Sequence, residues 1–521
     1  MIEGREVVSR RGAVAADPPE AARIGSRVLA AGGNAMDAIA AAGIAGCMLA
    51  PAAAGIGGYV GCAVVLSGDG QGQRVWSVDS NAVAPASAHD HMFEVISLGS
   101  PAERLEDTRA MQSNGTNEKE YACRVRDDAN VVGPLAVAVP GVMGCIGTLW
   151  ERWGRLEWRQ IVEPSRELLE NGLQLAGPDG LRHRPEMAET LGHIAEAGWQ
   201  DFYRGELARK IADGVQGAGG ILTRDDMAAF EPRVTEPYGS SYRDSSVHCA
   251  ILPNGGLTCL QILNMMECFD PPPVGSVEYW HLVAEVLKLA WRDRLRHLGD
   301  PDFVSVPVRR LLSKDYAAGR VESIRQFPRH VDMLIPPRAQ EHEHGTFHFS
   351  SADAEGNLVS MTLSHGGGFG SKFVVRGTGI VLGHGMCRFD PRPGRPNSIA
   401  GGKRPLNNTC PVLVRLPDRD IAAGLPGGRR LVSVAAQIVQ RMVDFGASAY
   451  EAAESPRLHV GAHEPLELME SVGSPILDGI GEIGHTVRKV RAVAGAAHCA
   501  EVLRGKALVR AGGNGWAAGV A

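Results

Sequence analysis

The sequence contains no run of basic residues interleaved with aromatic ones. Its 53 Lys and Arg residues are spread among 59 Asp and Glu residues, and the net charge is −6. Because a nucleic-acid groove needs clustered cations, we expect no nucleic-acid partner. The composition of a disordered or fibrous protein is also absent, since 44% of the 521 residues are apolar and the 65 glycines follow no period of three. We predict a globular chain with one large domain or two to four smaller ones.

Cys-x-x-Cys pairs are missing as well. Ten cysteines are scattered along the chain, most of them inside apolar stretches, which predicts buried free thiols. The first residues, MIEGREVVSRRGAVAA, are charged and contain no apolar segment typical of a secretory signal. We therefore expect a protein of the reducing cytoplasm.

One stretch, residues 38–66, carries no charge and is long enough to cross a bilayer. It contains Pro51 and six glycines, and its many Ala and Gly residues contribute little transfer free energy. The proline followed by Gly-Ile-Gly-Gly predicts a helix, a sharp turn and a buried strand. We therefore expect no membrane partner.

Helical and strand patterns divide the chain. The Ala-rich pattern of residues 19–49 is interrupted by a Gly-Gly-Asn turn, which predicts two helices. Helical spacing dominates residues 133–330, whereas short alternating runs follow Gly345. We expect helices at residues 141–153, 155–172 and 276–298, and strands at residues 346–350, 358–364, 378–383, 411–415 and 430–434. The polar residues 103–130 predict a surface excursion or an insertion.

A histidine-rich segment leads into the first of these strands. It contains His342, Glu343, His344 and His348. Their spacing matches no common zinc pattern, so a metal site is the weaker hypothesis. Thr346 directly after Gly345 suggests other chemistry: if the chain is cut between them, Thr346 has a hydroxyl and a free α-amine that can deprotonate it.

Acyl transfer also requires donors directed at the developing oxyanion. Gly427 and Gly428 follow Pro426 in a turn and offer two backbone N–H groups without side chains. An ordinary loop can have the same composition. The turn alone therefore leaves both interpretations open.

Six motifs resemble those of gamma-glutamyltransferase proenzymes, in the order and spacing of that family, over residues 11–519. They are GGNAMDA at 32–38, GIGG at 55–58, GPLAVAVPG at 133–141, TFHFS at 346–350, GKRPL at 402–406 and LPGG at 425–428. The resemblance implies an N-terminal nucleophile hydrolase with an α+β fold, a four-layer αββα sandwich in which helices cover two stacked β-sheets. The expected order of helices first and strands later agrees with that arrangement without dictating it.

The resemblance also implies self-cleavage into two subunits. Residues 1–345 would form the large subunit with the helix-rich half, and residues 346–521 the small subunit with the strand-rich half. Carried over residue by residue, Thr346 is the nucleophile of self-cleavage and of catalysis. Thr362 and Ser364 help to orient it, and Gly427 and Gly428 form the oxyanion hole. No cofactor is implied.

Three departures from the family pattern fall on its substrate-recognition residues. Asn81, in DSNAVAP, stands where the family has an Arg for the α-carboxylate of the glutamyl group, so a bidentate carboxylate fork is absent. Arg388, in GHGMCRF, stands where an Asp holds the α-ammonium, and a cation there would repel that group. Asn407 and Asn408 replace two serines and can still donate hydrogen bonds.

We therefore expect a hydrolase or acyltransferase for a small amide whose acyl group carries a carboxylate but no neighbouring ammonium. The alternatives are a glutathione hydrolase, a carbon–carbon bond hydrolase in a natural-product pathway such as one making modified prolines, and an uncleaved binding protein. Phe347 replaces a small hydroxyl residue beside the nucleophile and could slow cleavage. Arg388 could instead point to solvent or pair with Asp390, and Asn81 could cap a turn. A dimer of the subunit pair is possible, and His384 and Cys387 have no assigned role.

Overall fold

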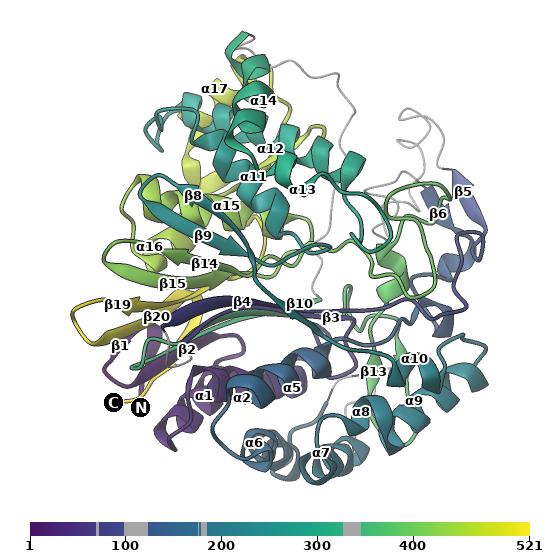
Figure 1. Ribbon diagram of the computed structural model, residues 1–521. Helices are drawn as coiled ribbons and strands as arrows, with labels where there is room; N and C mark the ends of the chain where they lie inside the picture. Colours follow the sequence, from purple (N-terminus) through teal and green to yellow (C-terminus); the bar gives the residue numbers. More distant parts are fainter. Residues whose placement is uncertain (69–71, 98–122, 176, 179–184, 327–344) are drawn as a thin grey trace.

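The structure is a computed structural model that describes residues 1–68, 72–97, 123–175, 177–178, 185–326 and 345–521. Two helix layers enclose two β layers, as Figure 1 shows. The two termini lie side by side at one edge of the sandwich, because β1 (Ile2–Ser9) pairs with β20 (Leu508–Gly519). The elements form the αββα arrangement that the resemblance implies.

One continuous 13-stranded sheet supplies both β layers. The first layer has the order β7, β4, β3, β11, β10, β2 and then β20. Its strands are β2 (Gly12–Ala16), β3 (Val60–Gly68), β4 (Gln73–Asn81), β7 (Arg233–Thr235), β10 (Thr346–Asp353) and β11 (Leu358–Ser364). The pair β10 and β11 lies between β3 and β2, so segments from both sides of Gly345 are woven into one layer.

The second β layer continues from β20 through β19, β15, β14, β9 and β8. Residues 508–513 of β20 pair with β19, whereas residues 516–519 pair with β2, so β20 passes from one layer into the other. The other strands of this layer are β8 (Tyr238–Tyr242), β9 (Ser245–Cys249), β14 (Val412–Arg415), β15 (Arg419–Gly424) and β19 (His498–Leu503).

Serine hydroxyls connect the two β layers. Ser350 Oγ on β10 donates to the His498 carbonyl at 3.0 Å, and Ser360 Oγ on β11 donates to the Ala423 carbonyl at 2.8 Å. Small buried apolar side chains fill much of the remaining interior. Because each of these hydroxyls has a backbone acceptor, it can be buried without a large desolvation cost.

The helices below the first layer are α1 (Pro19–Ala30), α2 (Ala35–Leu49), α5 (Val142–Trp153), α6 (Trp158–Glu170) and α7 (Pro185–Ala197). Asn34 begins α2 by accepting from the backbone N–H groups of Met36 and Asp37, which satisfies donors at the helix end. Gly43 and Gly46 let α2 approach the strands, where Met361 and Phe349 fill the space that a side chain would need. The two helices predicted in residues 19–49 are confirmed.

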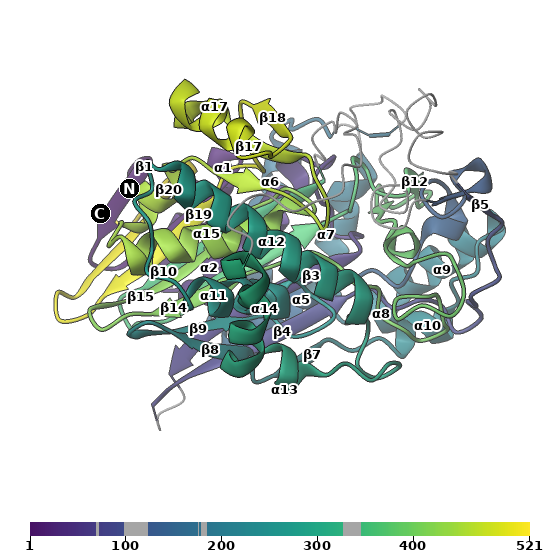
Figure 2. The same ribbon diagram turned by 90° about the horizontal axis from the view of Figure 1, so that it is seen from above.

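The helices above the second layer are α11 (Gly256–Met266), α12 (Val277–His297), α14 (Lys314–Gln326), α15 (Arg430–Asp444), α16 (Ala449–Glu454) and α17 (Ser474–Glu482). Beside α17 lies a small sheet of β16 (Leu458–His459), β17 (Leu466–Met469) and β18 (Val487–Val490), seen from above in Figure 2. The strand predicted at residues 430–434 is wrong, because these residues begin α15. Leu431, Val434 and Ile438 recur at helical spacing, and a five-residue window is too short to show that period.

The described residues contain further α-helices and β-strands. They are α8 (Asp201–Arg204), α9 (Glu206–Gly217), α10 (Arg224–Ala228), α13 (Val308–Leu311), β5 (Val95–Ser97), β6 (Cys123–Val125), β12 (Phe373–Val374) and β13 (Val381–Leu382). Of the strand predicted at residues 378–383, only β13 is formed. Most of the predicted polar excursion, residues 103–122, lies outside the described residues. In the part of the chain that the structure describes, every helix is too short or too polar to cross a membrane.

Candidate active site

Thr346 is the first residue of β10, opposite Ser364 at the end of β11. The two hydroxyl oxygens are 2.9 Å apart, which is hydrogen-bond distance. Ser364 is buried, whereas Thr346 is half-buried. Ser364 Oγ also donates to the carbonyl oxygen of Gly345 at 2.5 Å. The structure therefore brings Gly345, Thr346 and Ser364 together at one end of the two strands.

Thr362 lies two residues back along β11, in register with His348. Its Oγ1 is 2.9 Å from Nδ1 of His348, so the hydroxyl of Thr362 orients this imidazole. His348 is fully buried, and burial lowers the pKa of its ring well below the usual value. Burial disfavours the charged form, so the neutral imidazole is favoured.

His348 also connects β10 with β15. Gly424, the last residue of β15, lies so close to the imidazole that a side chain at this position would overlap the ring. The spacing of the histidines in the sequence suggests a role for His348 only as a metal ligand. The alternation of Thr346, His348 and Ser350 along one face of a strand is the signal in the sequence that indicates a packing role.

Gly427 and Gly428 lie in the loop between β15 and α15. Their φ angles are +146° and +59°, and a Cβ at Gly427 would overlap Ala494, so this backbone needs glycine. The loop is held by a hydrogen bond of 2.9 Å from the Gly495 N–H to the Pro426 carbonyl. Both glycines therefore lie within four residues after Gly424, the end of β15, which packs against His348.

Arg388 ends a short 3-10 helix, Gly385–Arg388, and its side chain is buried. Its guanidinium carbon lies 5.4 Å from the centroid of the Tyr59 ring, a cation–π distance. The alternative in which Arg388 points to solvent is wrong. The carboxylate of Asp390 binds Arg392 through two hydrogen bonds of 2.9 and 2.7 Å.

Asn81, the last residue of β4, is fully buried. Its side-chain amide donates to the carbonyl of Pro405 at 2.6 Å. Strand register aligns it across the sheet with Val60, Ser364 and Thr346, so three strand spacings, about 14 Å, separate Asn81 from the nucleophile position. Asn81 thus fastens the end of β4 to the GKRPL segment.

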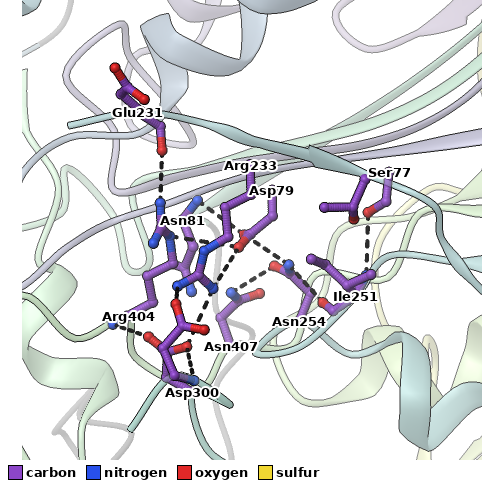
Figure 3. Close-up of polar contacts among 12 residues, drawn as sticks. Ser77, Asp79, Asn81, Glu231, Arg233, Ile251, Asn254, Asp300, Arg404 and Asn407 are labelled. Carbon is purple, nitrogen blue, oxygen red and sulfur yellow. Dashed lines mark hydrogen bonds and ion pairs between the residues drawn. The ribbon is translucent and has the colours of Figure 1, made fainter.

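A buried polar cluster surrounds Asn81, as Figure 3 shows. Asp79 accepts a hydrogen bond of 3.0 Å from Asn254, and its other carboxylate oxygen lies 3.7 Å from Arg404 and 3.8 Å from Arg233. Burial raises the pKa of Asp79, and the charge of Arg404 is the largest opposing effect. Arg404 has its pKa lowered by the same loss of solvent. This cluster joins β4 to the segment that follows Lys403.

Asn407 and Asn408 differ in their surroundings. Asn407 donates to the side-chain oxygen of Asn254 at 2.8 Å and accepts from the backbone N–H of Thr409, so it belongs to the same buried cluster (Figure 3). The side-chain oxygen of Asn408 accepts from Arg294 at 2.9 Å. Both amides are therefore held by protein groups.

Two groups of side chains among the described residues have donor atoms close enough for a metal ion, and neither includes His348. One is Cys249, Cys259 and Cys410, and the other is His281, Glu285 and His485. In the second group, the ammonium of Lys288 already pairs with Glu285. His342, Glu343 and His344 lie outside the described residues. The prediction of buried free thiols is confirmed for every cysteine except Cys268, which is half-buried.

Comparisons with known proteins find relatives over most of the chain. The profile of the gamma-glutamyltranspeptidase family matches residues 21–117, 106–178 and 177–521. The glutathione hydrolase proenzyme of Pseudomonas sp. (strain A14) is 30% identical over 486 residues, 84% of this chain and 80% of that one. The acylase ACY 1 proenzyme of Pseudomonas sp. (strain SE83) is 32% identical over 528 residues, 95% of this chain and 90% of that one.

A solved structure is similar over the whole fold. The cephalosporin acylase from Bacillus halodurans superimposes with a TM-score of 0.83 and 25% sequence identity, covering 99% of this chain and 97% of that one. The likeness therefore includes both β layers and both helix layers.

Proposed function

The chain belongs to the gamma-glutamyltranspeptidase family and is an enzyme of the N-terminal nucleophile hydrolase type, and from this we propose that Thr346 is its nucleophile. We propose further that the precursor cuts itself between Gly345 and Thr346, and that the mature enzyme removes a carboxylate-bearing acyl group other than γ-glutamyl from a small amide. The observation that carries the proposal is the buried cation of Arg388 beside the strand ends that hold Thr346 and Ser364.

In the proposed cycle, the free α-amine of Thr346 takes the proton of its own hydroxyl as Oγ1 attacks the substrate carbonyl. The backbone N–H groups of Gly427 and Gly428 stabilise the oxyanion. The amide nitrogen takes this proton from the α-amine of Thr346 and leaves as an amine, and an ester on Thr346 remains. Water then hydrolyses this ester, or a second amine accepts the acyl group. Ser364 supports the nucleophile through the 2.9 Å contact between the two hydroxyls.

The choice of acyl group rests on charge. Arg388 Nη2 lies 2.9 Å from the place that a Cβ of Gly366 would occupy, next to the turn that follows Ser364. A guanidinium here binds a carboxylate through charge-assisted hydrogen bonds and repels an ammonium. Asn81, whose amide is bound to Pro405, supplies no cation for a second carboxylate. A glutaryl group fits this charge pattern, whereas a γ-glutamyl group adds an ammonium beside Arg388.

Glutathione hydrolysis is the second candidate, because the relative from strain A14 carries that name. The acylase name of the strain SE83 relative and the likeness to a cephalosporin acylase favour the first candidate. Carbon–carbon bond cleavage would use the same nucleophile on a different leaving group.

The two subunits of the proposed enzyme would stay together after the cut. β10 and β11 begin after Gly345 and are hydrogen-bonded on both sides to β2 and β3, which precede it. Separating residues 346–521 would break these two strand ladders and three more, β1–β20, β2–β20 and β9–β14, and would expose the apolar interior. The free cysteines favour a reducing compartment, the cytoplasm, as the place where this enzyme works.

The test is a paired assay with glutaryl and γ-glutamyl anilides, which differ only in the α-ammonium. The proposal expects kcat/KM for the glutaryl compound to exceed that for the γ-glutamyl compound by about 100-fold, since each charge contact contributes roughly 1.5–3 kcal/mol. A preference for the γ-glutamyl compound would make the enzyme a glutathione hydrolase. Cleavage of neither amide by a self-cut enzyme would favour carbon–carbon bond hydrolysis.

A further inference from the structure

Three hydrogen-bond donors converge on the carbonyl oxygen of Gly345 in the uncut chain. Ser364 Oγ donates to it at 2.5 Å and the backbone N–H of Gly366 at 3.3 Å. The backbone N–H of His365 donates to it at 3.2 Å and is shared with the Ala53 carbonyl at the same distance. A neutral peptide carbonyl is satisfied by one or two donors. A third donor becomes useful when the oxygen carries negative charge, as it does during attack on its carbon.

The turn after β11 aims these donors. Gly366 has a φ of +100°, in the region that residues with a side chain rarely adopt. A Cβ on Gly366 would also overlap the imidazole of His384. A glycine is therefore required at position 366 for the chain to fold back and direct the N–H of this residue toward the Gly345 carbonyl.

His384 fixes this turn from the other side. Its Nε2 accepts a hydrogen bond of 2.7 Å from the backbone N–H of Gly367, and its Nδ1 faces the carbonyl of Val131 at 3.2 Å. An imidazole that accepts at Nε2 and faces a carbonyl at Nδ1 carries its proton on Nδ1. The ring of His384 thus connects the turn to the segment that contains Val131, in the proposed large subunit.

Ser364 completes a path for a proton. Its oxygen accepts from the Gly366 N–H at 2.9 Å and lies 2.9 Å from Thr346 Oγ1. Since the single proton of Ser364 is donated to Gly345, the proton between the two hydroxyls belongs to Thr346. The chain of donors runs from Thr346 through Ser364 to the carbonyl oxygen.

We propose that Ser364 Oγ and the N–H groups of His365 and Gly366 form an oxyanion hole that acts once, on Gly345 during self-cleavage, and is separate from the glycine pair used in turnover. His384 is its positioning residue. The inference rests on the proposed function, because it assigns a transition-state site to the cut at Thr346.

Thr346 Oγ1 bonds to the Gly345 carbonyl carbon, and the three donors stabilise the negative charge that develops on the carbonyl oxygen. The proton of Thr346 then moves to Ser364 and the proton of Ser364 moves to this oxygen, which leaves a neutral tetrahedral intermediate. The C–N bond between Gly345 and Thr346 then breaks, the nitrogen takes up the proton and leaves as an amine, and an ester on Oγ1 remains. One water hydrolyses the ester, which gives the Gly345 carboxyl group and restores the Thr346 hydroxyl.

The first test measures the rate of self-cleavage after synthesis in a cell-free system, with fragments followed by gel and intact mass. Ser364→Ala removes one donor and the proton path, and we expect cleavage to slow by at least about 100-fold. Ser364→Thr keeps the hydroxyl and should cut within about tenfold of the parent. Ser360→Ala is the matched control, because this hydroxyl on the same strand contacts Ala423 instead of Gly345 or Thr346, and it should cut at the parent rate.

A second pair of variants tests the turn itself. His384→Leu removes the acceptor for the Gly367 N–H and should slow self-cleavage by about tenfold or more, whereas His384→Gln offers a side-chain oxygen at that place and should restore most of the rate. A general packing defect would slow both variants alike. This pair also decides the matter if Ser364→Ala fails to fold.

The outcomes separate the inference from the proposed function. If the parent cuts at Thr346 while Ser364→Ala cuts within about threefold of its rate, the inference is overturned and the nucleophile assignment stands. If both His384 variants match the parent, the positioning role is overturned. A parent that never cuts between Gly345 and Thr346 overturns the proposed function and the inference together.

Discussion

The guanidinium of Arg388 lies over the ring of Tyr59, 5.4 Å from its centroid. The ring face supplies negative electrostatic potential to a buried cation. The resemblance aligns Arg388 with a position at which the family pattern has an Asp, which implies that the charge beside the proposed nucleophile Thr346 is reversed. This reversal is the physical basis for expecting an acyl group that carries a carboxylate and no ammonium.

Replacing Arg388 should change which acyl group is accepted. In Arg388→Asp, we expect kcat/KM for a glutaryl anilide to fall by about 100-fold or more, because a carboxylate then faces a carboxylate. In Arg388→Met, kcat/KM for the glutaryl anilide should fall less than in Arg388→Asp, because the cation is removed but no carboxylate is introduced to repel the substrate. The measurement is kcat/KM with the glutaryl and γ-glutamyl anilides. An unchanged ratio between the two substrates would mean that Arg388 does not contact the acyl group.

Removing the charge of Arg404 should destabilise the fold. Arg404→Met leaves the buried carboxylate of Asp79 with one cation fewer, and we expect the free energy of unfolding to drop by about 3 kcal/mol. Arg204→Met is the control: its ion pair with Glu231 is exposed, and its loss should cost less than about 1 kcal/mol. Urea unfolding compares the two. Equal effects would show that the cluster around Asp79 is not a stabilising centre.

His365 should make stability depend on pH. Burial lowers the pKa of its ring to about 3, and neither ring nitrogen has a hydrogen-bond partner among the described residues. Between that value and the usual value of about 6.5, the unfolded chain binds a proton that the folded chain does not, so stability is lost as the pH falls through this window.

The variant His365→Leu should remove this contribution. We expect the slope of the unfolding free energy against pH to decrease by up to about 1.4 kcal/mol per pH unit between roughly pH 4 and pH 6. Urea titrations across this range give the slope. A slope equal to that of the parent would show that His365 gains its proton without opening the fold.

Gly424 and Gly481 should respond in opposite directions to alanine. A Cβ at Gly424 overlaps the ring of His348, so Gly424→Ala should cost about 1–3 kcal/mol through overpacking. Gly481 lies inside helix α17, where a Cβ would meet no neighbour within 4 Å, and Gly481→Ala should stabilise by about 0.5–1 kcal/mol. Calorimetry of both variants gives the sign. Stabilisation by Gly424→Ala would contradict the close contact.

Local sequence patterns predict the helices and strands in which the periodic pattern extends over many residues, or whose ends carry a capping or turn residue. The alternation from Leu358 to Ser364 gives β11 with its observed bounds, and the Gly-Gly-Asn turn separates α1 from α2 because Asn34 caps the second helix. The strand predicted at residues 430–434 is wrong because five residues fit the helical period of 3.6 and the strand period of 2 equally well. Longer windows resolve this ambiguity.

The side-chain contacts of the candidate site are harder to predict from the sequence. The sequence pattern and the resemblance predict that Thr346 and Ser364 lie close together, and the strand register pairs them. They do not show that Thr362 binds His348, that Asn81 binds Pro405 or that His384 fixes the turn at Gly367. The Asn81–Pro405 contact joins segments far apart in the chain. The other two contacts depend on the exact register of β10 against β11 and on the path of the turn after Ser364, which a single sequence does not fix.

The most direct test of the account is the intact mass of the purified protein beside that of Thr346→Ala. The account predicts two species in the parent, residues 1–345 and residues 346–521, and one uncut chain in the variant. Cleavage at the same bond in both proteins, or an uncut parent, would contradict the assignment of Thr346 as the nucleophile.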